Sequence, residues 1–177
     1  MDQLSLYLHI PFCRHRCAYC DFNTYTSLMD LREAYADALV TEMAQVAGGV
    51  RRPVHTVFFG GGTPSLMPAA SLERILDGVR ANFVLAGGAE LSMEANPGTV
   101  DLAYLTAVCQ AGINRLSFGV QSVIPSELAL LEREHDFATV VEAVALARQA
   151  GRDNTNLRLI YGAPRHTLTR WHERAQP

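Results

Sequence analysis

The chain has 177 residues, 49% of them apolar, which is enough to bury one sizeable core. Its net charge is −3 and its basic residues are scattered, so it lacks the clustered cations of a nucleic-acid surface. No apolar run reaches membrane-spanning length, peripheral membrane association is left open, and the cysteine usage fits a reducing cytoplasm.

The first half of the chain predicts two strands with a helix between them. Leucine and isoleucine alternate with Ser5, Tyr7 and His9 over residues 4–10, the period of a strand. A cysteine-rich loop follows, and apolar residues at helical spacing then predict a helix over residues 28–43. The second strand covers residues 54–59 and runs into the glycines 60–62.

The second half continues the alternation. Asp101 is a suitable N-cap for one of its helices, and Gly151 is a suitable C-cap for another. The predicted elements are a helix over 72–79, a strand over 90–95, a helix over 102–111, a strand over 113–121, a helix over 140–147, a strand over 156–161 and the start of a helix over 167–174.

Regular β–α alternation predicts an α/β fold with parallel strands and crossover helices. Five strands can form an open sheet or most of a partial barrel. In barrels, chemistry is located at the carboxyl ends of the strands, and the cysteines, the glycines 60–62, Glu94 and Gln121 all fall there. Each position alone also fits a tight turn or a solvated polar residue; together they predict a site.

Cys13, Cys17 and Cys20 have the spacing C-x3-C-x2-C, with no fourth cysteine nearby. Three thiolates suit a [4Fe-4S] cluster that keeps one iron open for another ligand, whereas such clusters usually take four cysteines. Zinc is an alternative, because His9 and His15 are close, but zinc sites more often combine two C-x2-C pairs from separate segments. A disulfide framework does not fit a chain whose first residues already read as a strand.

The string Tyr7-Leu-His-Ile-Pro-Phe-Cys13, continued by Tyr19-Cys20-Asp-Phe-Asn23, resembles radical S-adenosylmethionine (SAM) proteins. Within them it is most similar to the oxygen-independent coproporphyrinogen III oxidase-like family, in its branch of HemW-type heme chaperones. The resemblance implies a partial (β/α)6 TIM-like barrel. Residues 1–177 would then be an incomplete radical SAM core domain, truncated after about five strands and without the C-terminal domain.

The resemblance also implies a ligand set. Cys13, Cys17 and Cys20 correspond to the cluster ligands, and SAM would chelate the open iron through its amine and carboxylate. The positions that match SAM contacts in the family are Tyr7, Tyr19, Gly61, Gly62, Thr63, Glu94, Gln121 and Arg133. No catalytic residue is assigned, and none of the histidines lies in a clear heme-ligand motif.

The sequence departs from the family at the fifth strand. The family's string resembles Asp-Leu-Ile-Tyr-Gly-Leu-Pro-Gly-Gln-Thr, whereas this chain reads Arg158-Leu-Ile-Tyr-Gly-Ala-Pro-Arg-His-Thr167. Alternation places Arg158 on the face opposite Leu157 and Leu159. On a barrel interior this cation needs a partner, and Glu94 is the candidate. We therefore expect weakened SAM affinity.

Three functions follow from the resemblance. The first is a chaperone that binds heme and transfers it to recipient proteins, with an electron donor as a further partner. The second is an oxygen-independent coproporphyrinogen III oxidase, and the third is an inactive fragment. The sequence favours the chaperone over the enzyme because Phe22 stands where the oxidase branch has a further cysteine, and because Cys13 lies near the start of the chain.

Overall fold

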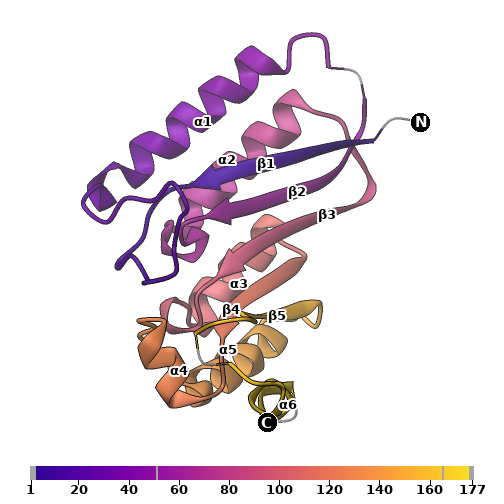
Figure 1. The fold of residues 1–177 in the computed structure, drawn as a ribbon. Helices are drawn as coiled ribbons and strands as arrows, with labels where there is room; N and C mark the ends of the chain where they lie inside the picture. The colour runs from indigo at the N-terminus through magenta and orange to yellow at the C-terminus, as the bar shows by residue number, and fades with distance from the viewer. Residues whose placement is uncertain (1–2, 51, 165, 176–177) are drawn as a thin grey trace.

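A computed structural model describes residues 3–50, 52–164 and 166–175 of the chain. Within them a single sheet has the strand order β1-β2-β3-β4-β5 (Figure 1). Every neighbouring pair is parallel, which confirms the predicted α/β fold. The strands are β1 (Leu4–Ile10), β2 (Val54–Gly61), β3 (Leu85–Ala95), β4 (Arg115–Gln121) and β5 (Thr155–Leu159).

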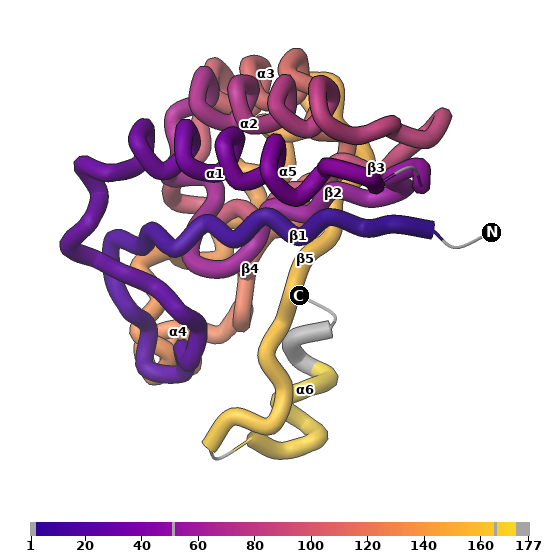
Figure 2. Tube along the Cα trace, turned by 90° about the horizontal axis from the view of Figure 1, so that it is seen from above, coloured from indigo at the N-terminus to yellow at the C-terminus, as the bar shows by residue number. Residues whose placement is uncertain are grey.

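The longer crossover helices cover one face of this sheet. Figure 2 shows α1, α2, α3 and α5 in a layer on the same side of the strands, with α4 and α6 outside that layer. The helices are α1 (Arg32–Val46), α2 (Ala69–Asn82), α3 (Leu102–Ala111), α4 (Pro125–Leu130), α5 (Phe137–Gln149) and α6 (Leu168–Ala175), with short 3-10 turns at Met29–Leu31, Pro64–Leu66 and Pro97–Thr99. None of the helices in the described residues is long and apolar enough to cross a bilayer.

The core lies between the sheet and this helix layer. Phe59, Met93 and Phe118 are each fully buried on the helix-facing side, and burying such a side chain stabilises the fold by roughly 1.5–3 kcal/mol. The opposite face carries Tyr7, Glu94 and other polar or aromatic residues at alternate positions. The two faces therefore differ in character: one packs against the helices as the core, and the other is not covered by the helix layer.

The element boundaries differ from the sequence prediction in places. The first helix begins at Arg32, since residues 29–31 form a 3-10 turn. β3 begins at Leu85, whereas the sequence predicted a start at residue 90. The prediction began too late because Gly87 and Gly88 weaken the strand signal. β5 ends at Leu159, and the six-residue α4 was not predicted. The predicted caps are confirmed: Asp101 accepts from the Tyr104 amide, and Gly151 has a φ of 81°.

Candidate functional site

A cavity of about 730 Å³ opens at the carboxyl ends of the strands. The parallel sheet brings these ends to one rim, so loops that are far apart in sequence share a wall. The cavity is lined by every residue that the resemblance matched to a cluster ligand or a SAM contact, except Tyr7. These residues are Cys13, Cys17, Tyr19, Cys20, Gly61, Gly62, Thr63, Glu94, Gln121 and Arg133.

Backbone hydrogen bonds close the base of the cysteine loop. The Cys13 amide donates to the Tyr25 carbonyl at 3.1 Å, and the Tyr25 amide donates back to Pro11 at 2.7 Å. Cys13 is buried, whereas Cys17 and Cys20 are partly exposed. Burial raises the pKa of the Cys13 thiol, while the nearby Thr63 hydroxyl, 3.6 Å from its sulfur, opposes that rise. One thiol is thus fixed at the base of the cavity, and two lie on the loop above it.

Gly62 lets the end of β2 approach the cysteine loop. Its amide donates to the Ile10 carbonyl at 2.7 Å, and the neighbouring Thr63 amide donates to Phe12 at 2.8 Å. A Cβ at Gly62 would lie 2.7 Å from the Phe12 carbonyl oxygen and 3.0 Å from the Cys13 sulfur. The absence of a side chain therefore leaves a cradle beside Cys13 in which backbone can meet a ligand.

The three thiols fit a cubane better than a single ion. Within the described part of the chain, no three Cys, His, Asp or Glu side chains converge closely enough to bind one metal ion. The thiolates that bind a cubane need not converge on one point, because each of them binds a different iron. Cys13, Cys17 and Cys20 on the wall of one cavity, beside the Gly62 cradle, are therefore a suitable donor set for a [4Fe-4S] cluster.

Arg133 reaches the cysteine loop from the opposite wall. Its Nη1 donates to the Cys17 sulfur at 3.4 Å and to the Tyr19 hydroxyl at 3.5 Å. Its Nη2 donates to the Gly119 carbonyl at 3.2 Å and meets His135 Nδ1 at 3.4 Å, while its Nε is buried without a hydrogen-bond partner. Burial raises the pKa of the Tyr19 hydroxyl to about 12 despite the opposing charge of Arg133, so Tyr19 stays neutral.

Arg158 forms an ion pair with Glu94, as the alternation pattern predicted. In register, Arg158 of β5 lies beside Gly119 of β4, and its Nη1 reaches across that strand to Glu94 Oε1 on β3. The Glu94 side chain is 14% exposed and that of Arg158 is 43% exposed. The carboxylate assigned to SAM by resemblance is therefore engaged by a cation of the chain itself.

Two rim residues other than glycine have positive φ angles. Gln121, which ends β4, has a φ of 68°, and Glu132, just before Arg133, has a φ of 54°. This conformation is uncommon outside glycine and marks positions that the surrounding structure holds in place. Glu132 also pairs with His15 of the cysteine loop at 3.1 Å. The turn at residues 132–133 thus contacts the cysteine loop through both of its side chains, Glu132 and Arg133.

Tyr7 does not line the cavity. It lies on the face of β1 opposite the buried Leu8 and Ile10, is 57% exposed, and donates from its hydroxyl to His9 Nδ1 at 2.9 Å. Burial, and then the negative charge of Glu94, raise the pKa of the Tyr7 hydroxyl. The structure places it below the group of residues that meet at the rim.

The sequence reasoning missed a hydroxyl cluster behind the rim. The Ser65 hydroxyl accepts from the Asn96 amide at 3.0 Å and lies 2.6 Å from the Thr99 hydroxyl, which donates to the Asn96 carbonyl. Asn96 and Thr99 line the cavity, whereas Ser65 is buried. No sequence pattern signals this cluster, because it joins the loops after β2 and β3 only in the folded sheet.

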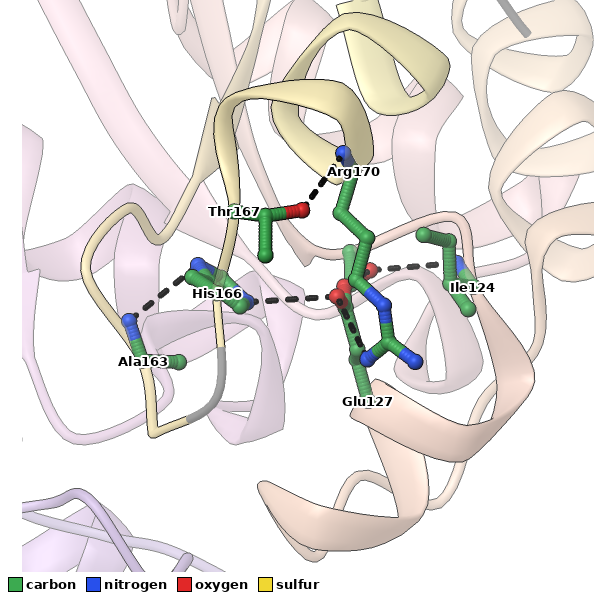
Figure 3. A network of polar contacts seen from close by, with 7 residues as sticks. Ile124, Glu127, Ala163, His166, Thr167 and Arg170 are labelled. Carbon is green, nitrogen blue, oxygen red and sulfur yellow. Dashed lines mark hydrogen bonds and ion pairs between the residues drawn. The ribbon is translucent and has the colours of Figure 1, made fainter.

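A second missed group joins α4 to the segment after β5 (Figure 3). The buried Glu127 accepts from the Ser122 hydroxyl at 2.5 Å, and His166 and Arg170 approach its other oxygen at 3.2 and 3.9 Å. Serine, histidine and glutamate are the residue types of a hydrolase triad, but here the carboxylate lies between the other two, and Ser122 is fully buried. This network therefore fixes the position of α4.

A model of the radical SAM superfamily matches residues 7–175. The chain is 42% identical over 170 residues to the heme chaperone HemW of Escherichia coli, a match that covers 95% of this chain and 45% of that protein. It is 38% identical over 178 residues to the oxygen-independent coproporphyrinogen III oxidase of Paracoccus denitrificans, covering 98% of this chain and 39% of that one.

Among solved structures, the chain is similar to coproporphyrinogen III oxidase (HemN) from Escherichia coli, described as a radical SAM enzyme. The TM-score is 0.86 at 35% identity, and the match covers 97% of this chain and 40% of that one. The chain thus spans less than half of the length of these relatives and corresponds to the N-terminal part of the radical SAM barrel.

Proposed function

The chain belongs to the radical SAM superfamily, and we propose that it binds a [4Fe-4S] cluster through Cys13, Cys17 and Cys20 with SAM in the adjoining cavity. The observation that carries this proposal is the meeting of three thiols on the wall of one cavity with the Gly62 cradle beside them. Residues 1–177 would form the cluster- and cofactor-binding part of a radical SAM core.

The cavity residues have separate tasks in this proposal. The backbone at Gly61 and Gly62 and the Thr63 hydroxyl would hold the amino acid end of SAM. Gln121 can donate and accept, and Tyr19 offers a neutral ring with a hydroxyl. Arg133 would orient the cysteine loop, whereas Glu94 is available only when it is released from Arg158. The cluster and SAM, when bound, supply one-electron chemistry.

For the whole protein, we propose a heme chaperone that passes heme to recipient proteins in the cytoplasm and takes electrons from a donor. Curated relatives from Escherichia coli and Mycobacterium tuberculosis, 42% and 44% identical to this chain, are named heme chaperone HemW. The residue after Asp21 supports this branch, because Phe22 is an exposed apolar side chain at the cavity wall and cannot serve as a fourth thiolate.

The second candidate is an oxygen-independent coproporphyrinogen III oxidase. The likeness to the HemN structure, with a TM-score of 0.86, favours it, as does the Paracoccus denitrificans relative. Both candidates use the same cofactor site, so that site cannot distinguish them. Turnover of coproporphyrinogen III under reducing anaerobic conditions discriminates directly: the chaperone predicts none, and the oxidase predicts release of carbon dioxide.

The test of the cofactor proposal is anaerobic iron–sulfur reconstitution followed by EPR of the reduced protein with and without SAM. We expect a [4Fe-4S]+ signal that changes on SAM addition. Cys17→Ser should lose it, whereas Cys109→Ser, which alters a cysteine in α3 away from the cavity, should keep it. A protein that binds zinc in place of iron under these conditions would refute the proposal.

A further inference from the structure

His135 lies behind Arg133 and outside the cavity wall. It is 6% exposed, and it comes two residues after Arg133 on the segment between α4 and α5. Its Nε2 is 3.1 Å from the Val120 carbonyl oxygen, and its Nδ1 is 3.4 Å from Arg133 Nη2. Each ring nitrogen therefore has one partner, and neither partner is a ligand.

These two partners determine the tautomer of the ring. A carbonyl oxygen can only accept, so Nε2 carries the proton that it donates to Val120. A guanidinium can only donate, so Nδ1 must be unprotonated to accept from Arg133. The geometry is thus satisfied by the neutral Nε2–H form, and an imidazolium would turn an Nδ1–H toward a cation.

We propose that His135 is a positioning residue that holds the Arg133 guanidinium against the cysteine loop. This inference rests on the proposed function, because its consequence concerns the cluster that Cys17 would bind. Nothing in the sequence resemblance gives His135 a role. It acts one step behind the cavity, through the hydrogen bond that it accepts from Arg133.

The donor hydrogens of Arg133 show why one acceptor matters. Two hydrogens on Nη1 go to the Cys17 sulfur and the Tyr19 hydroxyl, and two on Nη2 go to the Gly119 carbonyl and His135. A planar guanidinium held at both Nη2 hydrogens cannot rotate without breaking a buried contact. Gly119 and His135 therefore orient the two Nη1 hydrogens toward the loop.

The contact with Cys17 gives this orientation a measurable effect. Hydrogen bonds to the sulfurs of an iron–sulfur cluster are among the factors that set its reduction potential. A donor on the Cys17 sulfur stabilises the more negative, reduced cluster and raises the potential. Partners one step behind metal ligands also matter for retention, with losses of about 10- to 100-fold in metal affinity or activity when they are removed.

The test compares two substitutions of His135 in the full chain. His135→Gln keeps one acceptor and one donor on a similar frame, whereas His135→Leu keeps the apolar volume and neither hydrogen bond. His172→Leu is the matched control, since His172 is exposed on α6. The readouts are the nitrogen chemical shifts of the His135 ring in the cluster-free protein and the cluster midpoint potential from EPR-monitored redox titration.

We expect the shifts of a neutral Nε2–H ring in the wild-type protein at about pH 7.5. The His135→Leu potential should be more negative than wild type, with His135→Gln restoring it and His172→Leu leaving it unchanged. An Nδ1–H or charged ring, or equal potentials in wild type and His135→Leu, would overturn the inference.

Failure of the proposed function gives a different result. If no cluster forms in the wild-type protein, the cofactor assignment is wrong, and the ring tautomer alone then decides the positioning role. If His135→Leu does not fold, Arg133→Lys replaces it, because lysine keeps the charge and loses the planar fork. A wild-type potential in Arg133→Lys would also overturn the inference.

Discussion

A single residue, Arg158, places a cation beside Glu94 on the cavity wall. Its pairing with Glu94 neutralises a carboxylate that is 14% exposed, and it does so from a strand two positions away in the sheet. SAM carries an ammonium, a sulfonium and ribose hydroxyls, which are all better met by a carboxylate than by a guanidinium. The pair therefore competes with the cofactor for Glu94.

We predict that Arg158→Asp tightens SAM binding by about tenfold, equivalent to roughly 1.4 kcal/mol. The physical reason is the release of Glu94 and the loss of a cation from the cavity wall. Isothermal titration calorimetry of the reconstituted protein measures the change. Arg115→Asp is the matched control, because it breaks the Arg115–Glu90 pair, which joins β4 to β3 outside the cavity. An unchanged dissociation constant in Arg158→Asp would refute the competition.

His135 provides a prediction about stability and pH. Burial, and then the charge of Arg133, lower the pKa of its imidazole in the folded protein. The unfolded chain binds a proton near pH 6.5, so the stability that the neutral ring contributes is present above that pH. It is lost as the pH falls through the lower folded pKa.

We therefore expect wild-type protein to lose more free energy of unfolding than His135→Gln between about pH 7.5 and 5.5. Urea denaturation at both values measures it. Asp136 does not affect the comparison. The hydrogen bond from the Thr139 amide lowers the pKa of the Asp136 carboxyl from its ordinary value, so this group titrates below the window. Parallel pH dependences in the two proteins would show that His135 is not buried as a neutral ring.

At the scale of elements, the β2–α2 loop shapes the cluster site through its backbone. The glycine run from β2 brings amides to Ile10 and Phe12, and so it fixes the distance between the first two strands at the rim. Any side chain at Gly62 must displace the Phe12 carbonyl and would crowd the Cys13 sulfur and the Ile10 carbonyl. The cradle therefore requires that residue 62 has no Cβ.

We predict that Gly62→Ala lowers the free energy of unfolding by about 1–3 kcal/mol, the usual cost of overpacking. It should also reduce the iron retained per chain after reconstitution. Gly87→Ala in β3 is the control, since a Cβ there meets nothing within 4 Å, and such a change is expected to stay within about 0.5 kcal/mol. Equal iron retention in the two variants would argue against the cradle.

The elements that carry local patterns were predictable, and so was much of the site. Alternation with period two placed Arg158 on the face of Glu94, and the order of strands placed the cysteines, glycines and Gln121 at one rim. The short α4 was missed because six residues give no periodic signal. Its buried Glu127 and the nearby His135 were missed because one partner of each, His166 and Val120, is distant in sequence.

At the scale of the whole molecule, burial is uneven along the sheet. Six of the seven residues of β4 are buried, whereas no residue of β5 is, and Leu157 remains 49% exposed. In the described residues, β5 is an edge strand. Beyond its end, the Tyr161 ring packs against Trp171 of α6, and Arg170 of α6 approaches Glu127 on α4. A strand with little buried apolar surface opens locally at low free-energy cost.

We predict that β5 amides exchange with solvent at least about tenfold faster than β4 amides, a difference of roughly 1.4 kcal/mol in opening free energy. Hydrogen exchange followed by mass spectrometry measures both strands in one experiment. The other edge strand, β1, is the internal control, because Leu8 and Ile10 are buried and should slow its exchange. Because Arg158 lies on β5, each opening also frees Glu94, so SAM that binds Glu94 should favour the open strand and speed its exchange further. Equal protection of β4 and β5 would mean instead that the sheet opens as one cooperative unit.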